Sequence, residues 1–294
     1  LPGPRGMNEG PWTVRRLLTW TTRHFERRSV DAPRLTSELL LAHVLGLTRV
    51  RLYTDLDRPL EQAELGSLRA LIERRTAGEP VQYLTGIREF SGRPFRVDPR
   101  VLIPRPETEL LVDEVVSALR GAAAPRLVDV GTGSGCIAVT LAQELPGARV
   151  LATDVDPDAC AVARANAEAL GVGGRVEIRQ GELLDPVADQ PPFDAVVSNP
   201  PYVRSGDLPG LQREVRREPA RALDGGPDGL HVIRRLLDAA FDRLAPEGLL
   251  ALEIGEDQGD AVRDLLVARG YERVRIARDL ERRERMAFGT RPRG

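Results

Sequence analysis

One stretch restricts the fold of this 294-residue chain more than any other: "RLVDVGTGSGCIAVTLA", from Arg126 to Ala142. An apolar run that favours a β-strand leads into Gly131, Gly133 and Gly135, and a helix-forming run follows at once. Glycines permit the sharp turn and let a ligand approach the backbone beside a helix N-terminus. The spacing differs from the G-x-G-x-x-G of dinucleotide-binding loops, and a tight turn without a ligand is the alternative interpretation. The stretch predicts a strand, a loop suited to ligand binding and a helix.

The rest of the chain after Pro125 repeats this alternation of strand-like and helix-like runs. We expect seven strands, at residues 126–130, 149–154, 175–180, 193–198, 248–254, 271–276 and 285–289. Amphipathic runs at "SGCIAVTLAQEL" and "PDACAVARANAEAL" are typical of the helices between the first three strands. Such alternation favours βαβ units. The expected fold class is therefore α/β, with a doubly wound seven-stranded sheet of parallel strands and helices on both faces.

The residues before Pro125 show a different pattern of apolar residues, which indicates a separate small domain. Helical periodicity runs from Trp12 to about Gly78, and aromatic and β-branched residues punctuated by glycine and proline follow it. We therefore expect an N-terminal helical domain at residues 7–79, a β-hairpin and linker at 80–104, and the α/β domain at 105–294. The residues before Met7 have neither an apolar run nor an arginine-rich amphipathic pattern, so we expect no targeting segment there.

The second and third predicted strands end in residues suited to binding an adenosine. Asp154 ends the second strand about 20 residues beyond the glycine loop, where a carboxylate can accept both ribose hydroxyls. Its alternative role is to cap the next helix, but Asp156 is better placed for that. Glu182 and Leu183 follow the third strand and could line an adenine pocket. Parallel strands bring their carboxyl ends to one edge of a sheet, so these residues together predict an adenosine-containing ligand.

The fourth predicted strand ends in "SNPPY", which brings Asn199, Pro200, Pro201 and Tyr202 to the same edge. Consecutive prolines end the strand in a stiff corner with acceptors and few donors. A planar amide or amino nitrogen is a poor nucleophile because its lone pair is delocalised. The Asn199 side-chain oxygen and the Pro200 carbonyl would accept its two N–H bonds and direct the lone pair at an electrophile, while Tyr202 would stack on the planar group. The alternative interpretation is a rigid strand-ending turn.

Together, "VDVGTGSG", "TDVDP" and "SNPPY" resemble the class I S-adenosylmethionine-dependent methyltransferases that act on a planar nitrogen. Through "LIPRPETE", "EPARALDGGPDGL" and "LEIGEDQG", nearly the whole chain after Met7 resembles the release factor glutamine methyltransferases, the PrmC/HemK family. The resemblance implies a Rossmann-like enzyme of translation termination. Its substrate would be the side-chain amide nitrogen, N(5), of the glutamine in the Gly-Gly-Gln motif of class I peptide chain release factors. S-adenosyl-L-methionine would be the cofactor and S-adenosyl-L-homocysteine the product, with no metal.

The resemblance also implies roles for individual residues. Those implied to hold the cofactor come from the glycine loop, two strand ends and the proline corner: Gly131, Thr132, Gly133, Ser134, Gly135, Asp154, Glu182, Leu183 and Asn199. Those implied to bind the substrate amide are Asn199, Pro200, Pro201 and Tyr202, of which Asn199, Pro200 and Tyr202 would be catalytic. Some family members carry tryptophan at the position of Leu183, so an aromatic contact with adenine is missing here. The helical N-terminal domain would hold the release factor.

Two other functions remain open at this point. An adenine amino-methyltransferase acting on DNA or RNA shares the proline corner and the physical reason for it. A net charge of −2 and the lack of a basic, aromatic-rich segment for reading bases argue against it, so no direct DNA binding is expected. A non-catalytic S-adenosylmethionine-binding sensor or assembly protein would use the same fold. That function predicts a damaged substrate corner, whereas Asn199 to Tyr202 are all present.

Composition sets the remaining limits. Cys136 and Cys160 have no metal-type spacing, and His24, His43 and His231 are isolated, so we expect neither a disulfide framework nor a metal site. All 42 basic residues are arginine. No apolar run approaches the length that spans a bilayer, and we expect a cytoplasmic protein without membrane contact.

Overall fold

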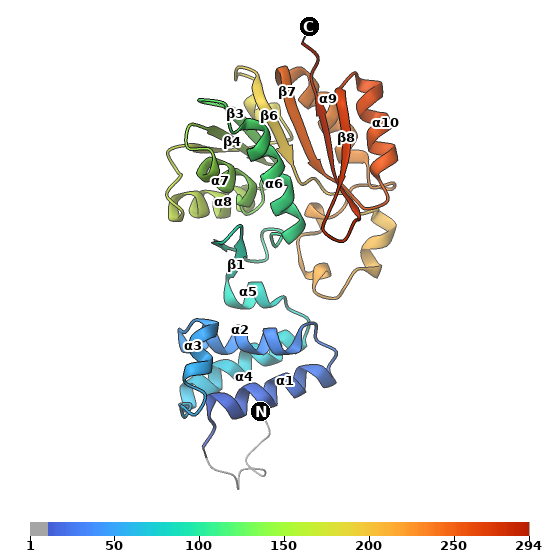
Figure 1. Cartoon of the computed structure of the whole chain (residues 1–294). Coiled ribbons are helices and arrows are strands. Elements are labelled where there is room, and N and C mark those ends of the chain that lie inside the picture. The colour runs from blue at the N-terminus through green and yellow to red at the C-terminus, as the bar shows by residue number, and fades with distance from the viewer. Residues whose placement is uncertain (1–10, 294) are drawn as a thin grey trace. The chain divides into compact units, whose positions relative to one another are not determined.

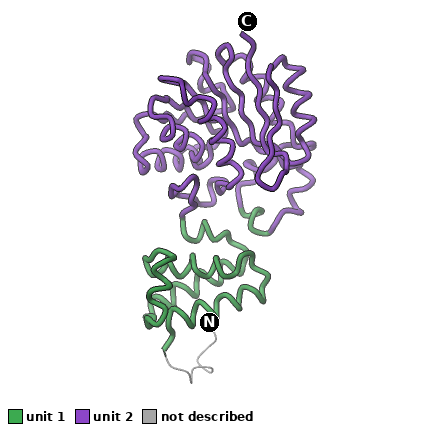
Figure 2. Tube along the Cα trace, in the orientation of Figure 1, with its two compact units in different colours: residues 1–86, 213–217 green, residues 87–212, 218–294 purple. Residues whose placement is uncertain are grey.

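The computed structural model describes residues 11–293, so the segment before Met7 lies outside the described residues. The chain divides into two compact units (Figure 2). Unit 1 contains residues 1–86 and 213–217, and unit 2 contains residues 87–212 and 218–294. The borders of the functional domains after residues 79 and 104 stay a prediction. Unit 2 is thus interrupted once, by five residues that belong to unit 1.

Unit 1 is built from helices (Figure 1). Their bounds are α1 Val14–Arg27, α2 Pro33–Leu45, α3 Arg49–Thr54, α4 Gln62–Thr76 and α5 Val81–Thr85. The Thr13 side chain accepts a hydrogen bond from the backbone N–H of Arg16 at 3.3 Å and so caps α1. The apolar faces of these helices meet in one core, in which Phe25, Leu40 and Leu68 are fully buried. The helical periodicity of the sequence reflects this shared core.

The segment 213–217 packs on α4 although it is distant in sequence. Glu214 forms an ion pair with Arg75 at 2.5 Å, and the Arg75 side chain is only 2% exposed. Arg213 donates to the Thr76 carbonyl at 3.1 Å, and Arg217 donates to the Ala77 carbonyl at 3.2 Å. These carbonyls lie at the end of α4, where backbone acceptors lack partners inside the helix. Two arginines from a distant part of the sequence therefore supply hydrogen-bond donors to the C-terminal end of α4.

The predicted hairpin region begins differently from the expectation. Residues 81–85 form the short helix α5, which ends at Gly86 with φ 73°. The hairpin follows as β1 Ile87–Phe90 and β2 Arg93–Arg96, paired antiparallel. The sequence analysis did not predict a helix at residues 81–85. The reason is that a five-residue helix is too short to show a repeating apolar pattern.

Unit 2 contains a sheet of the seven predicted strands, in the order β5-β4-β3-β6-β7-β9-β8. Their bounds are β3 Arg126–Val130, β4 Arg149–Asp154, β5 Val176–Gln180, β6 Phe193–Ser198, β7 Leu244–Glu253, β8 Glu272–Arg278 and β9 Glu284–Thr290. The fold class is confirmed, but the sheet is mixed because β9 runs antiparallel to both β7 and β8. The connection from β8 to β9 spans residues 279–283, which is too short for the crossover that parallel strands need.

Helices cover both faces of the sheet (Figure 1). They are α6 Pro106–Leu119, α7 Cys136–Glu144, α8 Pro157–Ala169, α9 His231–Arg243 and α10 Gly259–Arg269. On β3, Leu127 packs into a core with α6, α7 and α8, while its neighbour Val128 packs into a second core with α9 and α10. Successive side chains of a strand point to opposite faces, so a strand covered on both sides is mainly apolar on both faces. The apolar run before Gly131 therefore follows from its central place.

Within residues 11–293, no helix is both long and apolar enough to cross a bilayer. The same part of the chain contains no group of three or more His, Cys, Asp or Glu side chains that could hold a metal ion. Cys136 and Cys160 are buried free thiols.

Candidate active site

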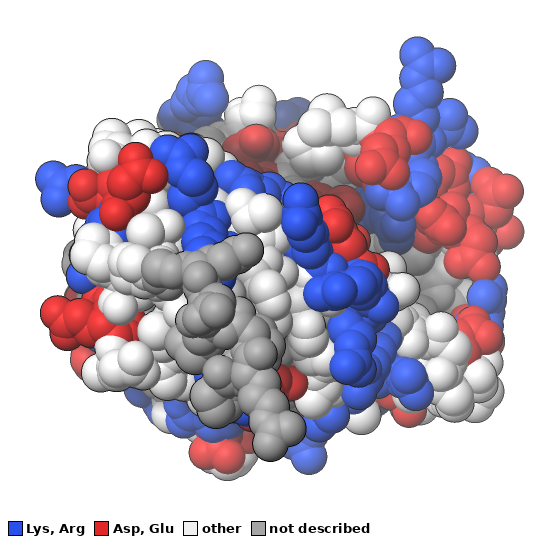
Figure 3. All heavy atoms as spheres, turned by 90° about the horizontal axis from the view of Figure 1, so that it is seen from below, with Lys and Arg blue, Asp and Glu red and all other residues white. Residues whose placement is uncertain are grey.

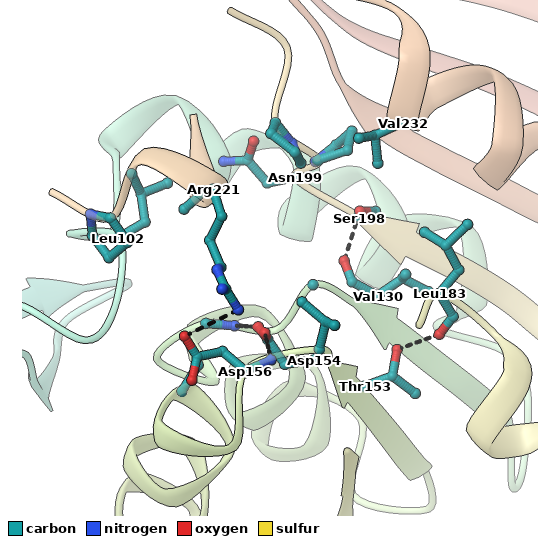
Figure 4. Close-up of a pocket in the computed structure, with 18 of the residues that line it drawn as sticks. Leu102, Val130, Thr153, Asp154, Asp156, Leu183, Ser198, Asn199, Arg221 and Val232 are labelled. Carbon is teal, nitrogen blue, oxygen red and sulfur yellow. Dashed lines mark hydrogen bonds and ion pairs between the residues drawn. The ribbon is translucent and has the colours of Figure 1, made fainter. Parts of the chain in front are cut away.

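A cavity of about 420 Å³ lies in unit 2 at the carboxyl ends of β3, β4, β5 and β6 (Figure 4). The chain order reverses between β3 and β6, which is where open α/β sheets bind ligands. The volume lies in the range of pockets for small ligands. The lining includes these residues predicted from the sequence: Gly131, Gly133, Asp154, Glu182, Leu183, Asn199, Pro200 and Pro201. Residues far apart in the chain therefore meet at one edge of the sheet, as predicted.

The glycines of the loop have two different structural roles. Gly131 and Gly133 have φ values of 71° and 53°, and a Cβ atom added to either would meet no atom within 4 Å. Gly135 also has a positive φ, 81°, but its Cβ would lie 3.2 Å from Ala163 of α8. Positive φ disfavours other residues at all three positions. The first two glycines thus leave room for a ligand, and the third lets α7 and α8 pack closely.

Thr132 and Ser134 belong to the glycine loop, but both are buried and neither lines the cavity. The Thr132 hydroxyl donates to Asp129 Oδ2 at 2.6 Å, and both residues are buried. The Ser134 carbonyl accepts from the Asn166 side chain at 2.8 Å, and the Asn166 amide also bonds both backbone groups of Arg96 in the hairpin. These two loop residues support the shape of the glycine loop, and their prediction as direct cofactor contacts stays untested.

Asp154 connects the glycine loop to the end of β4. Its Oδ2 accepts from the backbone N–H of Gly133 at 2.9 Å, and its Oδ1 accepts from that of Asp156 at 2.9 Å. Burial raises the pKa of Asp154, and these two backbone donors act against that rise. The side chain of Asp156 caps α8 by accepting from Asp158, as the sequence indicated. Asp154 is therefore free of helix capping and presents its carboxylate at the cavity.

The end of β5 contributes Glu182 and Leu183 to the same wall. Leu183 has a φ of 45°, an uncommon conformation for a branched apolar residue. Its carbonyl accepts from the Thr153 hydroxyl at 2.7 Å, which holds the turn against β4 (Figure 4). Glu182 forms an ion pair with Arg235 at 2.8 Å, and both side chains are nearly half exposed. Leu183 thus contributes an apolar side chain to the cavity wall.

The corner after β6 is held from behind by side chains that sequence reasoning missed. Asn199 Nδ2 donates to the Thr108 hydroxyl at 3.1 Å, and the Tyr202 hydroxyl donates to Glu253 at 3.2 Å. Burial raises the pKa of Tyr202 above its ordinary value, so the phenol keeps its proton. Tyr202 lies outside the cavity lining, and its predicted stacking on the substrate stays a prediction. A threonine in "RPETE" and a glutamate in "LEIGE" carry no local signal of this role.

Other lining residues come from outside the predicted motifs. Leu102 belongs to the loop before α6, whose position is held by Glu218 through hydrogen bonds from the Ile103 backbone at 2.9 Å and from Arg105 at 2.6 Å. Arg221 extends across the cavity toward Asp156, with 3.5 Å between guanidinium and carboxylate (Figure 4). The segment around residue 220 therefore forms part of the cavity wall.

Comparisons with known proteins agree with this geometry. The family model described as PrmC N-terminal domain matches residues 16–86, and the one described as Methyltransferase small domain matches residues 106–238. A release factor glutamine methyltransferase from Moorella thermoacetica is 47% identical over 274 residues, which are 93% of this chain and 96% of that protein. One from Geobacter sulfurreducens is 45% identical over 268 residues, covering 90% of this chain and 93% of that protein.

A solved methyltransferase structure from Pyrococcus furiosus is similar with a TM-score of 0.51 and 19% identity, covering 76% of this chain and 98% of that one. At 19% identity, this structural similarity is evidence for a shared fold only. The mixed seven-stranded sheet, its helices and the cavity at its switch point define an α/β methyltransferase. The similarity to the two relatives extends over at least 90% of this chain. The chain therefore belongs to the release factor glutamine methyltransferase family.

Proposed function

We propose that the chain transfers a methyl group from S-adenosylmethionine to N(5) of the glutamine in the Gly-Gly-Gln motif of class I release factors. The observation that carries the proposal is that the Asn-Pro-Pro corner and the glycine loop line one cavity. The names of the curated relatives support the release factor as substrate and glutamine as the target. Cytoplasmic translation termination is the process in which such a modification would act.

The residues of the cavity fit S-adenosylmethionine. Open space in front of Gly131 and Gly133 leaves room for a ligand close to the backbone. Asp154 would accept the ribose hydroxyls, and Leu183 would cover the adenine. When bound, the cofactor supplies a methyl group on a positively charged sulfur, and S-adenosylhomocysteine remains after transfer.

The chain's own contribution is to orient the substrate amide. Asn199 Oδ1 and the Pro200 carbonyl would accept the two N–H bonds of the glutamine amide and turn its lone pair toward the methyl group. The same two acceptors would stabilise the positive charge that develops on nitrogen. Tyr202 would cover the planar amide and exclude water. A methylated, protonated amide is a strong acid, so water can remove its proton without a dedicated base.

The helical unit 1 is the part that we propose for holding the release factor. Residues 16–86 of this unit match the family model described as PrmC N-terminal domain. Arg15, Arg23 and Arg27 of α1 are exposed, and Figure 3 shows arginine side chains, with acidic side chains beside them, on the face viewed there. Such a surface suits an acidic protein partner through rim charges that steer association.

A transfer assay tests the proposal directly. Methyl-labelled S-adenosylmethionine would be offered with a class I release factor, with the same factor carrying alanine in place of the Gly-Gly-Gln glutamine, and with adenine-containing DNA and RNA. We expect label on the intact release factor only. Label on nucleic acid would replace the proposal by an adenine methyltransferase, and cofactor binding without any transfer would favour a sensor protein.

A further inference from the structure

Three side chains extend inward from Asn199 and form a chain of hydrogen bonds. Asn199 Nδ2 donates to Thr108 Oγ1 at 3.1 Å, Thr108 Oγ1 donates to Glu253 Oε2 at 2.5 Å, and the Tyr202 hydroxyl donates to Glu253 Oε1 at 3.2 Å. Thr108 lies in the first turn of α6 and Glu253 at the end of β7, and each is 2% exposed. Two elements remote in sequence thus support the proline corner.

The carboxylate sets the direction of every bond in this chain. An ionised carboxylate can only accept, so Thr108 and Tyr202 each point their hydroxyl proton at Glu253. Thr108 has no second proton and presents only lone pairs toward Asn199. The partner that fits those lone pairs is the NH₂ group of the Asn199 amide. The amide oxygen Oδ1 is consequently left for the cavity side of the residue, which lines the pocket.

The opposite orientation of the amide would be costly and inactive. Turning the group over would bring Oδ1 against the lone pairs of Thr108 and leave a buried acceptor without a donor. It would also present NH₂ to the N–H of the substrate amide, and two donors cannot bond each other. Orientation of one side-chain amide therefore decides whether the corner can bind its substrate.

We propose that Thr108 and Glu253 are positioning residues that hold the Asn199 amide with its nitrogen inward and its oxygen toward the substrate. For its effect on turnover, the inference rests on the proposed function of Asn199 as acceptor. Burial raises the pKa of Glu253, and the hydroxyls of Thr108 and Tyr202 together with the charge of Arg285 on β9 act against that rise, whereas Glu107 on α6 adds to it. Two donors on the carboxylate match the charged form that the inference requires.

The composition of the chain permits a direct measurement of this orientation. The sequence contains three asparagines, Asn8, Asn166 and Asn199. Selective ¹⁵N labelling of asparagine gives one side-chain amide signal pair for each, and the pair of Asn199 is assigned by its loss in Asn199→Ala. We expect slow exchange with water for the Asn199 amide proton that faces Thr108, because it is hydrogen-bonded in a buried place.

Two variants at Thr108 separate the effect of the hydrogen bond from that of packing. Thr108→Val removes the hydroxyl at similar size, and Thr108→Ser keeps the hydroxyl but removes the methyl group. In Thr108→Val we expect the exchange of that amide proton to speed up by about tenfold or more and release-factor methylation to slow by a similar factor, as for loss of one hydrogen bond. Thr108→Ser should stay within about threefold of the wild type in both measurements. Cofactor affinity should stay within about twofold in both variants, since Thr108 does not line the pocket.

Glu253→Gln provides an independent variant. Its amide can donate to Thr108, which frees the threonine proton to point at Asn199 and favours the inactive orientation. We expect faster exchange and lower turnover, with cofactor affinity retained. Unchanged exchange and turnover in both Thr108→Val and Glu253→Gln would overturn the inference. So would equal losses in Thr108→Ser and Thr108→Val, which would show a packing role. The exchange measurement needs no substrate, so it decides the orientation even if the wild-type chain fails to methylate a release factor.

Discussion

The cavity has two halves, one lined by the glycine loop and Asp154 and the other by the Asn-Pro-Pro corner, and they differ in how their polar groups are held. The half that we propose for the cofactor consists of loop backbone, two glycines with open space in front of them and the carboxylate of Asp154, which accepts a hydrogen bond from Gly133. The half that we propose for the substrate presents the side-chain amide of Asn199, which is hydrogen-bonded to Thr108 and, through it, to Glu253. A backbone loop needs only the right turn to bind, whereas an amide side chain has two orientations and must be held in one.

Beneath each half lies a buried carboxylate, and the two are satisfied to different extents. Both oxygens of Glu253 accept hydrogen bonds from hydroxyls. Asp129 accepts with Oδ2 from Thr132 and the Ala138 backbone, while its Oδ1 has no partner among the described residues. Asp129 thus leaves one buried oxygen without a donor, at a cost in stability, whereas Glu253 does not.

The largest expected effect is on the substrate half. Asn199→Ala removes the proposed acceptor, and we expect turnover to fall by about two orders of magnitude, as when a transition-state hydrogen-bond partner is lost. Cofactor affinity should change by no more than a few-fold. Single-turnover assays and calorimetry measure the two quantities in parallel. Unchanged turnover would refute the role of Asn199, and a large loss of cofactor affinity would mean that the two halves are not separate.

Asp154→Ala is expected to give the opposite pattern. The variant loses the proposed ribose contact and the bond to Gly133, so S-adenosylmethionine affinity should fall by about tenfold or more, as for a hydrogen bond to a charged group. Glu177→Ala is a suitable control, because Glu177 lies on the neighbouring strand β5 outside the cavity lining and is paired with Arg179 at the surface. Its effect should stay within about threefold. Equal affinities for wild type and Asp154→Ala in equilibrium dialysis would refute the ribose assignment.

The same contrast explains what could be predicted from the sequence. Gly133 and Asp154 are separated by 21 residues within a single strand–helix–strand passage, and their signals are residue types at strand ends. Thr108 lies 91 positions from Asn199 and 145 from Glu253. No periodicity or turn pattern relates positions so far apart, since they meet only through the order of strands in the sheet and the packing of α6.

For the fold, too, local features were predictable from the sequence and long-range contacts were not. The seven strands were predictable because each is a short apolar run between turn or helix signals. Their order and the reversed direction of β9 depend on long-range pairing that the run itself does not encode. The attachment of residues 213–217 to unit 1 depends likewise on the ion pair of Glu214 with the buried Arg75.

An intermediate effect, on stability rather than activity, is expected at Asp129. Burial raises its pKa from 3.8 to about 7. A carboxyl whose pKa is higher in the folded than in the unfolded state keeps its proton on folding, so its cost appears as pH rises from about 4 and is complete above about 7. Asp129→Asn cannot ionise and avoids this cost. We expect the melting temperature of the variant, relative to wild type, to increase between pH 5 and pH 8. A constant difference across this range would contradict the shifted pKa.

The smallest effect is expected at the mouth of the cavity, where Arg221 reaches toward Asp156. The two groups are 3.5 Å apart, and the Arg221 side chain is 61% exposed. Exposed ion pairs contribute between zero and about 1 kcal/mol, so Arg221→Ala should change cofactor affinity by no more than about threefold, and less at high salt. Calorimetry at low and high ionic strength measures both. A tenfold or greater loss that persists at high salt would mean that the guanidinium contacts the cofactor itself. The cofactor half would then depend on an oriented side chain as the substrate half does, and the contrast between backbone and side-chain recognition would no longer hold.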